Sequence, residues 1–334
     1  MISLSVIDKM RPKNKQVNLF LLRENCGKAF YKKYHSKFVE VPCPSCSKNG
    51  EKVYQKYGYK HLKCENCLTV WCSPRPTGTL LSEYYASSES TKLWTSILVE
   101  TDVDRKVLQY EPRVNQLIRL LKKDKKFRPK LAVDLGAGSG AFALSLQNKS
   151  YFSEVIAVDF EENCCNVCNK NGLKTIKGSI DDLEDNLYSL ITMNDMIEHL
   201  FNPLDFLSKC NKVLTDNGYI SIACPNGEGF DFKLMKEKTV NITPPEHLNY
   251  FNPESIKLLL ESTGFEVVLL ETPGILDVSI IKREINQKNI DLSKNKFIED
   301  LLINGDDETL NSFQSFLREN KLSSHMLVIA KKIN

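Results

Sequence analysis

Four of the eleven cysteines in the chain have the spacing of a metal site. Cys43 and Cys46 form one C-x2-C pair, and Cys64 and Cys67 form a second pair after seventeen intervening residues. Each pair can offer two thiolates from one tight turn, and a tetrahedral zinc ion takes two such turns. Because four thiolates leave no open coordination position, the spacing predicts a structural Zn²⁺ site, with a hairpin between the two pairs.

Other roles for the cysteines are open. A single redox-active C-x-x-C is one alternative, and Cys72 or His61 lies close enough in sequence to replace one zinc ligand. The odd number of cysteines argues against a complete disulfide framework. We interpret the remaining ones as small buried hydrophobic residues in a reducing compartment, with a second metal site as the alternative for the first three of them: Cys164, Cys165, Cys168, Cys210 and Cys224.

A second constellation is the glycine-rich stretch LAVDLGAGSGAF at 131–142. Its core GAGSGA fits the dinucleotide fingerprint, which is weak evidence by itself. Asp134 precedes the first glycine by two residues, and a carboxylate there would repel a diphosphate at the helix N-terminus but suit a cationic ligand. Asp159 ends the next apolar run, where a carboxylate can accept hydrogen bonds from ribose hydroxyls. A ribose next to a positively charged tail describes S-adenosylmethionine (SAM).

The elements that must position these residues alternate along the chain after residue 130. Apolar runs predict strands at 130–135, 154–160, 174–178, 188–195, 218–225, 265–271 and 324–332, with helices at 140–147, 161–171, 202–214 and 253–263. This alternation predicts a doubly wound, Rossmann-like α/β sheet of seven strands, with the last strand antiparallel after a helical insert at about 275–322. Asp134, Asp159, Asn194 and Pro225 then fall at the carboxyl ends of strands, where such sheets bind ligands.

These motifs in this order resemble the class I SAM-dependent methyltransferases over about 130–334. VDLGAGSGAF is similar to their first motif, VIAVDF to the end of their second strand, GSIDDL (178–183) to their adenine-contacting segment and NDMIEHL (194–200) to their fourth-strand motif. The resemblance implies SAM as cofactor. It implies that the following residues line the cofactor site: Asp134, Gly136, Ala137, Gly138, Gly140, Asp159, Phe160, Ile180, Asp181 and Asn194.

Candidate bases for the acceptor are expected on the loops after the fourth and fifth strands. His199 follows the fourth strand, and His247 lies in PPEHLNYF (244–251) after the fifth. Glu246 could orient the imidazole of His247, although adjacent residues rarely hydrogen-bond well. Structural roles for both histidines are the alternative.

A narrower resemblance concerns this loop and the zinc ribbon. Together they are similar to the nucleotide-sugar C-methyltransferases, which implies Glu246 and His247 in proton abstraction and Tyr250 near the acceptor. That family carries a further α/β domain after the loop, whereas about 83 residues remain here, so O- or N-methylation is equally open. Tyr84 and Tyr85 are further candidate substrate-binding or lid residues. The acceptor is expected to be a nucleotide-linked sugar or another small polar metabolite.

Similar loops occur in ubiquinone-type O-methyltransferases, where a D/E-x-x-E-H group is associated with a divalent ion. Asp195, Glu198 and His199 match that spacing, which raises the alternative of a second metal. The ribbon is not typical of that family.

The expected organisation is a helical segment at 1–40, a zinc ribbon at 41–75, a linker (73–90) and helices covering the cofactor site at 76–128, and the catalytic domain at 129–334. Within the third part a helix is predicted over 104–124, with Pro112 as a break. The insert is expected to cap the acceptor pocket or to contact a second copy in a homodimer.

Charge distribution raises a competing function. Residues 1–63 carry 14 Lys/Arg and 4 Asp/Glu, although the whole chain has a net charge of only +3. A basic ribbon ahead of a methyltransferase core is also the layout of zinc-ribbon enzymes that methylate RNA bases, which is the alternative function. A non-enzymatic module with a degenerate SAM-binding domain is a third interpretation, which the intact Asp134 and Asp159 oppose. With no apolar stretch long enough for a membrane span or signal peptide, a cytoplasmic protein is expected.

Overall fold

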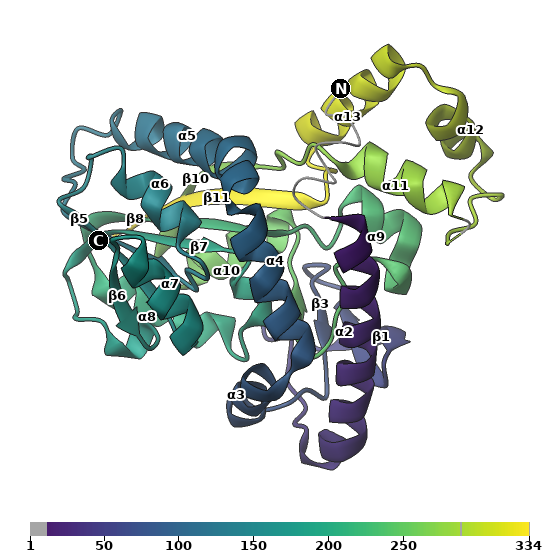
Figure 1. Cartoon of the computed structure of the whole chain (residues 1–334), viewed down its shortest axis with the longest axis horizontal. Coiled ribbons are helices and arrows are strands. Elements are labelled where there is room, and N and C mark those ends of the chain that lie inside the picture. The colour runs from purple at the N-terminus through teal and green to yellow at the C-terminus, as the bar shows by residue number, and fades with distance from the viewer. Residues whose placement is uncertain (1–11, 288, 334) are drawn as a thin grey trace.

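The computed structural model describes residues 12–287 and 289–333, which form two β-sheets with helices around them (Figure 1). The larger sheet has seven strands in the order β10-β11-β8-β7-β4-β5-β6. Its first five strands in the sequence are parallel, and β11 lies antiparallel to both of its neighbours. The strands are β4 (Leu131–Leu135), β5 (Glu154–Asp159), β6 (Lys174–Lys177), β7 (Tyr188–Asn194), β8 (Leu214–Pro225), β10 (Phe265–Glu271) and β11 (His325–Lys332). The predicted doubly wound sheet is confirmed, including its antiparallel last strand.

Helices cover both faces of this sheet. The apolar residues of α5 (Glu111–Leu121) recur at helical spacing and pack with α6 (Ala141–Gln147) and α7 (Glu162–Lys170) on one face. The other face is covered by α8 (Pro203–Val213) and α10 (Pro253–Ser262). Each fully buried Leu or Ile in these layers stabilises the fold by about 1.5–3 kcal/mol. Because helices pack on both faces of the sheet, the strands form a rigid support for the loops at their carboxyl ends.

The smaller sheet is the predicted ribbon with one unexpected strand. β1 (Gly50–Lys56), β2 (Tyr59–Cys64) and β3 (Val70–Cys72) form an antiparallel meander, and β9 (Asn249–Tyr250) pairs with the free edge of β3. β9 belongs to the loop PPEHLNYF, more than 170 residues later in the chain. The ribbon and the loop expected to carry the acceptor chemistry therefore share one sheet.

The helices between ribbon and sheet differ from the prediction. α3 (Gly78–Ser87) occupies most of the segment whose prolines and serines predict a linker, because Thr77 caps its N-terminus by accepting a hydrogen bond from the Leu80 backbone. α4 (Glu89–Arg105) runs through a π-turn (Lys106–Tyr110) directly into α5. Pro112 does not break the helix: it is the second residue of α5 and directly follows the π-helical segment Lys106–Tyr110. α2 (Lys13–Tyr34) packs alongside α4, as Figure 1 shows.

The helical insert is confirmed as three helices, α11 (Asp277–Asn286), α12 (Lys296–Asn304) and α13 (Asp307–Glu319). They form a small core of their own with α9 (Phe230–Met235), which follows β8. In the part of the chain that the structure describes, no helix is both long and apolar enough to cross a bilayer.

Candidate functional site

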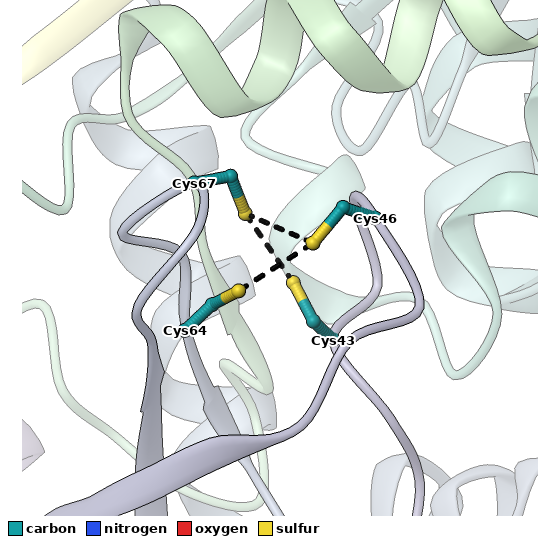
Figure 2. Close-up of side chains that lie close together, drawn as sticks. All are labelled: Cys43, Cys46, Cys64 and Cys67. Carbon is teal, nitrogen blue, oxygen red and sulfur yellow. Dashed lines mark hydrogen bonds between the residues drawn. The ribbon is translucent and has the colours of Figure 1, made fainter.

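The four cysteines of the ribbon converge on one point (Figure 2). Sulfur–sulfur distances are 3.5 Å from Cys43 to Cys67, 3.4 Å from Cys46 to Cys64 and 3.5 Å from Cys46 to Cys67. A tetrahedral zinc ion with Zn–S bonds of about 2.3 Å would hold its sulfurs about 3.8 Å apart, so a small relaxation fits the ion. The cluster matches the predicted donor set.

The two residues considered as replacement ligands lie outside this cluster. Cys72 directs its thiol to the carbonyl of Pro74 at 3.6 Å. His61 is fully buried, and its ring lies 5.1 Å from that of Tyr54 and 5.8 Å from that of Tyr250, measured between centroids. Its burial lowers the pKa to about 3, so the imidazole is neutral. Cys72 and His61 are therefore core residues of the ribbon.

The ribbon holds the loop 241–252 by backbone pairing. Val70 pairs with Tyr250 and Trp71 with Asn249, while the Cys72 N–H donates to the Leu248 carbonyl at 2.9 Å. This edge pairing fixes the register of the loop, and therefore which of its side chains point towards the large sheet.

The side chain of Asn249 makes hydrogen bonds to both sides of the contact between the ribbon and the loop 241–252. Buried Arg75 donates to its side-chain oxygen at 2.8 Å, and its amide donates to the carbonyl of Leu200 at 2.8 Å. One side chain thus joins the ribbon to the loop after β7.

The glycine loop follows β4 in the conformation that its sequence demands. Gly136, Gly138 and Gly140 all have positive φ, at 66°, 56° and 80°. A Cβ at Gly140 would lie 2.7 Å from the sulfur of Cys168, so neither the backbone nor the space accepts another residue. The loop therefore presents bare backbone at the N-terminus of α6.

Asp134 is buried at the carboxyl end of β4 and accepts a hydrogen bond of 2.6 Å from the Thr192 hydroxyl. Burial raises its pKa to about 7, and the nearby Asp159 carboxylate adds to this rise. The group therefore carries a destabilised negative charge, which a cationic ligand would neutralise.

Asp159 lies at the end of β5, directly across the glycine loop. Its two oxygens accept hydrogen bonds of 2.9 Å from the N–H groups of Gly138 and Glu161. Burial raises its pKa as well. A carboxylate oxygen has more than one lone pair, so both oxygens can still accept from ribose hydroxyls. The predicted pair of carboxylates thus flanks the loop from two strands.

The other predicted cofactor residues are arranged around this pair. Ala137 lies in the loop, Phe160 is 57% exposed, and Ile180 is buried at the start of the short 3₁₀ helix Ile180–Asp182. Asp181 is exposed and forms an ion pair with Lys209 at 2.7 Å. The predicted role of Asp181 beside the adenine stays a prediction.

The last predicted cofactor residue, Asn194, ends β7. Its side-chain oxygen accepts from Arg113 of α5 at 3.2 Å. Its side-chain amide acts on the neighbouring Asp134, where it lowers the pKa of the carboxyl against the effect of burial.

Helices were expected to cover the cofactor site within 76–128, but the sequence pointed to no particular residue of α4 (Glu89–Arg105), which lies over the glycine loop. The Ser139 hydroxyl donates to Asp102 at 2.8 Å, and the side chain of Leu98 comes within 4.0 Å of where a Cβ of Gly138 would lie. Thr95 reaches Glu161 at 3.5 Å. The prediction for this region started its helix at 104 because polar residues interrupt the apolar pattern of 89–103. α4 therefore covers the cofactor side of the loop.

Three acceptor-side residues converge beyond the ends of β7 and β8. The carboxylate of Glu198 and the imidazoles of His199 and His247 each place one ligand atom within 4.8 Å of the others. Glu198 is only 1% exposed, and in the described chain neither of its carboxylate oxygens has a hydrogen-bond partner. A buried unpartnered carboxylate facing two imidazoles is a donor set suited to a divalent cation.

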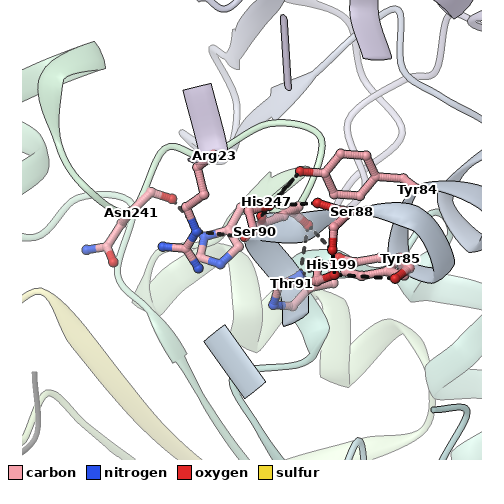
Figure 3. Close-up of polar contacts among 10 residues, drawn as sticks. Arg23, Tyr84, Tyr85, Ser88, Ser90, Thr91, His199, Asn241 and His247 are labelled. Carbon is pink, nitrogen blue, oxygen red and sulfur yellow. Dashed lines mark hydrogen bonds and ion pairs between the residues drawn. The ribbon is translucent and has the colours of Figure 1, made fainter. Parts of the chain in front are cut away.

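Hydrogen bonds to backbone carbonyls orient both imidazoles (Figure 3). Nδ1 of His247 lies 2.7 Å from the Asn241 carbonyl, and Nδ1 of His199 lies 2.8 Å from the Glu246 carbonyl. Because a carbonyl only accepts, each Nδ1 must carry the proton, and each Nε2 is left with a free lone pair. Burial lowers the pKa of both rings, which keeps them neutral.

Glu246 does not orient His247 as predicted. Its carboxylate forms an ion pair with Arg23 of α2 at 2.9 Å and accepts from Ser90 at 2.8 Å and Tyr84 at 3.3 Å. The carboxylate is therefore held by groups of α2, α3 and α4, and Glu246 lies in a turn that is closed by the hydrogen bond from the His247 N–H to the Thr243 carbonyl at 3.2 Å. Glu246 acts as an anchor between the loop and the N-terminal helices.

The three tyrosines predicted to meet the acceptor support the loop. The Tyr85 hydroxyl lies 2.8 Å from Nδ1 of His199 and 3.1 Å from the Glu246 carbonyl, and its ring contacts that of Phe160. The Tyr84 hydroxyl reaches Glu246, and the buried Tyr250 donates to the His247 carbonyl at 2.9 Å.

Asp195 does not join Glu198 and His199, although its spacing suggested a shared metal. It adopts a left-handed conformation, with φ of 51°, and its carboxylate meets Nε2 of His325 at 2.8 Å. The third member of the cluster is His247 instead, from a loop that no local spacing rule connects to residue 198.

Comparisons with known proteins agree with this geometry. Residues 106–270 match the family described as "Methyltransferase domain". Ubiquinone biosynthesis O-methyltransferase of Vibrio cholerae is 22% identical over 152 residues, or 41% of this chain and 61% of that enzyme. The chain thus spans about three fifths of the length of that curated relative.

Two solved structures align with part of the chain. A chain from the Haloferax volcanii complex between the Trm112 methyltransferase activator and a methyltransferase aligns with a TM-score of 0.48 and 14% identity, over 72% of this chain and 96% of that chain. A SAM-dependent methyltransferase from Archaeoglobus fulgidus aligns with a TM-score of 0.45 and 20% identity, over 66% of this chain and 92% of the other.

Proposed function

We propose that the protein transfers the methyl group of SAM to a hydroxyl or another polar atom of a small acceptor, since residues 106–270 match the family described as "Methyltransferase domain" and the large sheet has the strand order β10-β11-β8-β7-β4-β5-β6. The single observation that carries this proposal is the placement of Asp134 and Asp159 on either side of a glycine loop at the carboxyl edge of the sheet. Asp159 would bind the ribose, and Asp134 would face the cationic end of the cofactor.

The acceptor atom would be activated by the cluster of Glu198, His199 and His247. Methyl transfer by direct displacement needs a nucleophile aligned with the sulfonium, and the free Nε2 of either histidine can take its proton. The unpartnered oxygens of Glu198 fit a divalent cation held together with the two imidazoles. Such a cation, when bound, lowers the pKa of a neighbouring hydroxyl. An imidazole that held the cation through Nε2 would have no lone pair left for the proton, which would then pass to solvent while the three residues position the acceptor. Without a cation, Nε2 takes the proton.

A nucleotide-linked sugar or a polysaccharide precursor is the acceptor that we propose. The ribbon followed by the loop of Glu246 and His247 supports this choice. The RNA alternative is less well supported, because cations of the ribbon hairpin are engaged within the chain. Lys63 forms an ion pair with Glu228 at 2.5 Å, and Lys52 donates to the side-chain oxygen of Gln55 at 3.2 Å.

The test is a methyl-transfer assay with SAM labelled on its methyl group, offered to a panel of nucleotide sugars and to total RNA, with Mn²⁺ or Mg²⁺ present or chelated. We expect label in a nucleotide sugar and none in RNA, and the His247→Ala variant should lose it. Label in RNA alone would refute the proposed acceptor, and SAM that does not bind at all would refute the proposed function.

A further inference from the structure

A cavity borders the loop 241–252, which carries His247. It has a volume of about 640 Å³, which is in the range of small-molecule sites. Its walls come from α2, the turn between β1 and β2, the segment 235–243 and the insert helix α11. Except for 235–243, these segments lie outside the matched methyltransferase domain.

The inner end of this cavity reaches the acceptor-side residues. Arg23 lines the cavity and also forms the 2.9 Å ion pair with Glu246. Thr243 lines it too, and its carbonyl accepts from the His247 N–H at 3.2 Å. Figure 3 shows Arg23 and Asn241 beside His247. A molecule that fills the cavity would therefore end next to the loop that holds the catalytic imidazole.

The lining combines exposed apolar groups with unsatisfied polar ones. Val17 and Leu21, one turn apart on α2, are 60% and 56% exposed, which is unusual for paired aliphatic side chains on one helix face unless a ligand covers them. The amide nitrogen of Gln16 and the hydroxyl of Thr243 also line the cavity and have no hydrogen-bond partner in the described chain, although these residues are only 7% and 3% exposed. Buried polar atoms of this kind normally have a partner.

The charges and rings of the walls indicate the class of ligand. The walls carry both signs of charge: Arg23, Lys56, Lys238 and Arg283, and the carboxylates of Glu24, Glu237 and Glu284. Arg23, Arg283, Glu24 and Glu284 are each engaged in an ion pair. Lys56 and Lys238 donate to backbone carbonyls at 3.0 and 3.4 Å and have no salt bridge among the described residues, so two ammonium groups face the one remaining carboxylate, that of Glu237. Phe20 and Tyr57 place aromatic rings in the same walls. Ring faces stack on flat groups, and ammonium groups bind anions.

We propose that this cavity binds the non-reacting part of the acceptor, and that this part is an anion attached to an aromatic body, such as a nucleoside diphosphate. The inference rests on the proposed function only in naming the ligand as the acceptor. The insert and α2 thereby confer acceptor specificity that the matched domain does not contain.

Binding measurements test this without turnover. Uridine and thymidine diphosphate, and anilinonaphthalene sulfonate as an aromatic anion that is not a nucleotide, are titrated into the full chain by calorimetry or fluorescence. The Leu21→Trp variant fills the cavity, Lys56→Gln removes one ammonium, and Asn25→Trp adds the same bulk on an exposed position of α2 outside the lining.

We expect Leu21→Trp to weaken binding of the bound probe at least tenfold and Lys56→Gln to weaken it severalfold, while Asn25→Trp leaves it unchanged. If a nucleotide binds, the ligand of the cavity is a nucleoside phosphate. If the sulfonate alone binds, the ligand is another aromatic anion. Binding that is absent for all probes, or equal in wild type and Leu21→Trp, overturns the inference. SAM affinity, measured in parallel, reports separately on the proposed function.

Discussion

The side-chain amide of Asn252 donates a hydrogen bond of 2.8 Å to the carbonyl of Cys67. Asn252 caps α10 and ends the active-site loop, and Cys67 belongs to the second cysteine pair of the ribbon. Together with the pairing of β3 and β9, this bond makes the cysteine cluster part of the support of His247. The ribbon therefore helps to position the loop that carries His247.

Removing the metal from the cysteine cluster should loosen the active-site loop. We expect a mercurial with chelator, or the Cys46→Ser variant, to increase hydrogen exchange in 241–252 at least tenfold, because β9 loses its fixed edge. Protection of β4 and β7 and the affinity for SAM should stay within about twofold. Cys26→Ser, which changes a thiol outside the cluster, should behave as wild type. Unchanged exchange in 241–252 after metal loss would show that the ribbon does not support the loop.

Cofactor affinity should rise with pH because of Asp134. Its pKa in the folded protein is raised to about 7 by burial, so the carboxyl is largely protonated at pH 6 and largely ionised at pH 8. If the cationic cofactor requires the ionised form, its affinity rises about tenfold between these pH values, and binding at pH 6 releases a proton. Calorimetry in two buffers of different ionisation enthalpy measures both effects. Asp134→Asn should flatten the profile, and an equally steep profile in that variant would assign the effect elsewhere.

The same raised pKa has a consequence for stability. A buried carboxyl whose folded pKa exceeds its unfolded value favours folding only in its protonated form. Ionisation of Asp134 therefore lowers the free energy of unfolding as the pH rises from about 4 to about 7. The Asp134→Asn variant should lose this part of the pH dependence in urea unfolding, and wild-type slopes in the variant would contradict the assignment.

Much of the fold was predictable because its signals are local. The strand at 131–135 is a short apolar run ended by the glycines, and Asn252 followed by Pro253 marks the start of α10. The cysteine spacing predicted the cluster for the same reason: each pair lies in one turn. The linker predicted at 73–90 was wrong over α3, because tertiary packing of Leu80 and Tyr84 outweighs its turn-rich composition.

The candidate site was less predictable, because its members meet across long sequence separations. Arg23 reaches Glu246, and the unpartnered carboxylate of Glu198 faces His247, with no periodicity to link them. Spacing suggested Asp195 as the partner of Glu198, but its left-handed backbone turns it towards His325. These residues meet because β9 pairs with β3 of the ribbon, and no local sequence pattern predicts that pairing.

Substitutions in the cluster of Glu198, His199 and His247 should lower the rate of methyl transfer and leave the affinity for SAM almost unchanged. His247→Ala and Glu198→Gln should each lower kcat about a hundredfold or more, since proton transfer by a positioned group contributes that much. The affinity for SAM should change less than threefold. His35→Ala, an exposed histidine at the end of α2, is the matched control and should keep full activity. Full activity of both cluster variants would exclude the cluster from the reaction.

The pair of Arg23 and Glu246 should couple α2 to the loop energetically. Arg23→Met leaves a buried carboxylate without its cation and should lower the free energy of unfolding by about 3 kcal/mol. Adding Glu246→Gln should recover part of this loss, because the uncompensated charge is removed. A urea double-mutant cycle measures the coupling, and additive effects would mean that the two side chains act independently.

Calorimetric titration of SAM, and separately of NAD, tests the central claim most directly. Wild-type protein should bind one SAM per chain and no NAD, and Asp159→Ala should weaken SAM binding at least tenfold, because two ribose hydroxyls lose their acceptor. A protein that binds NAD in the glycine loop, or binds SAM equally well without the Asp159 carboxylate, would contradict the account.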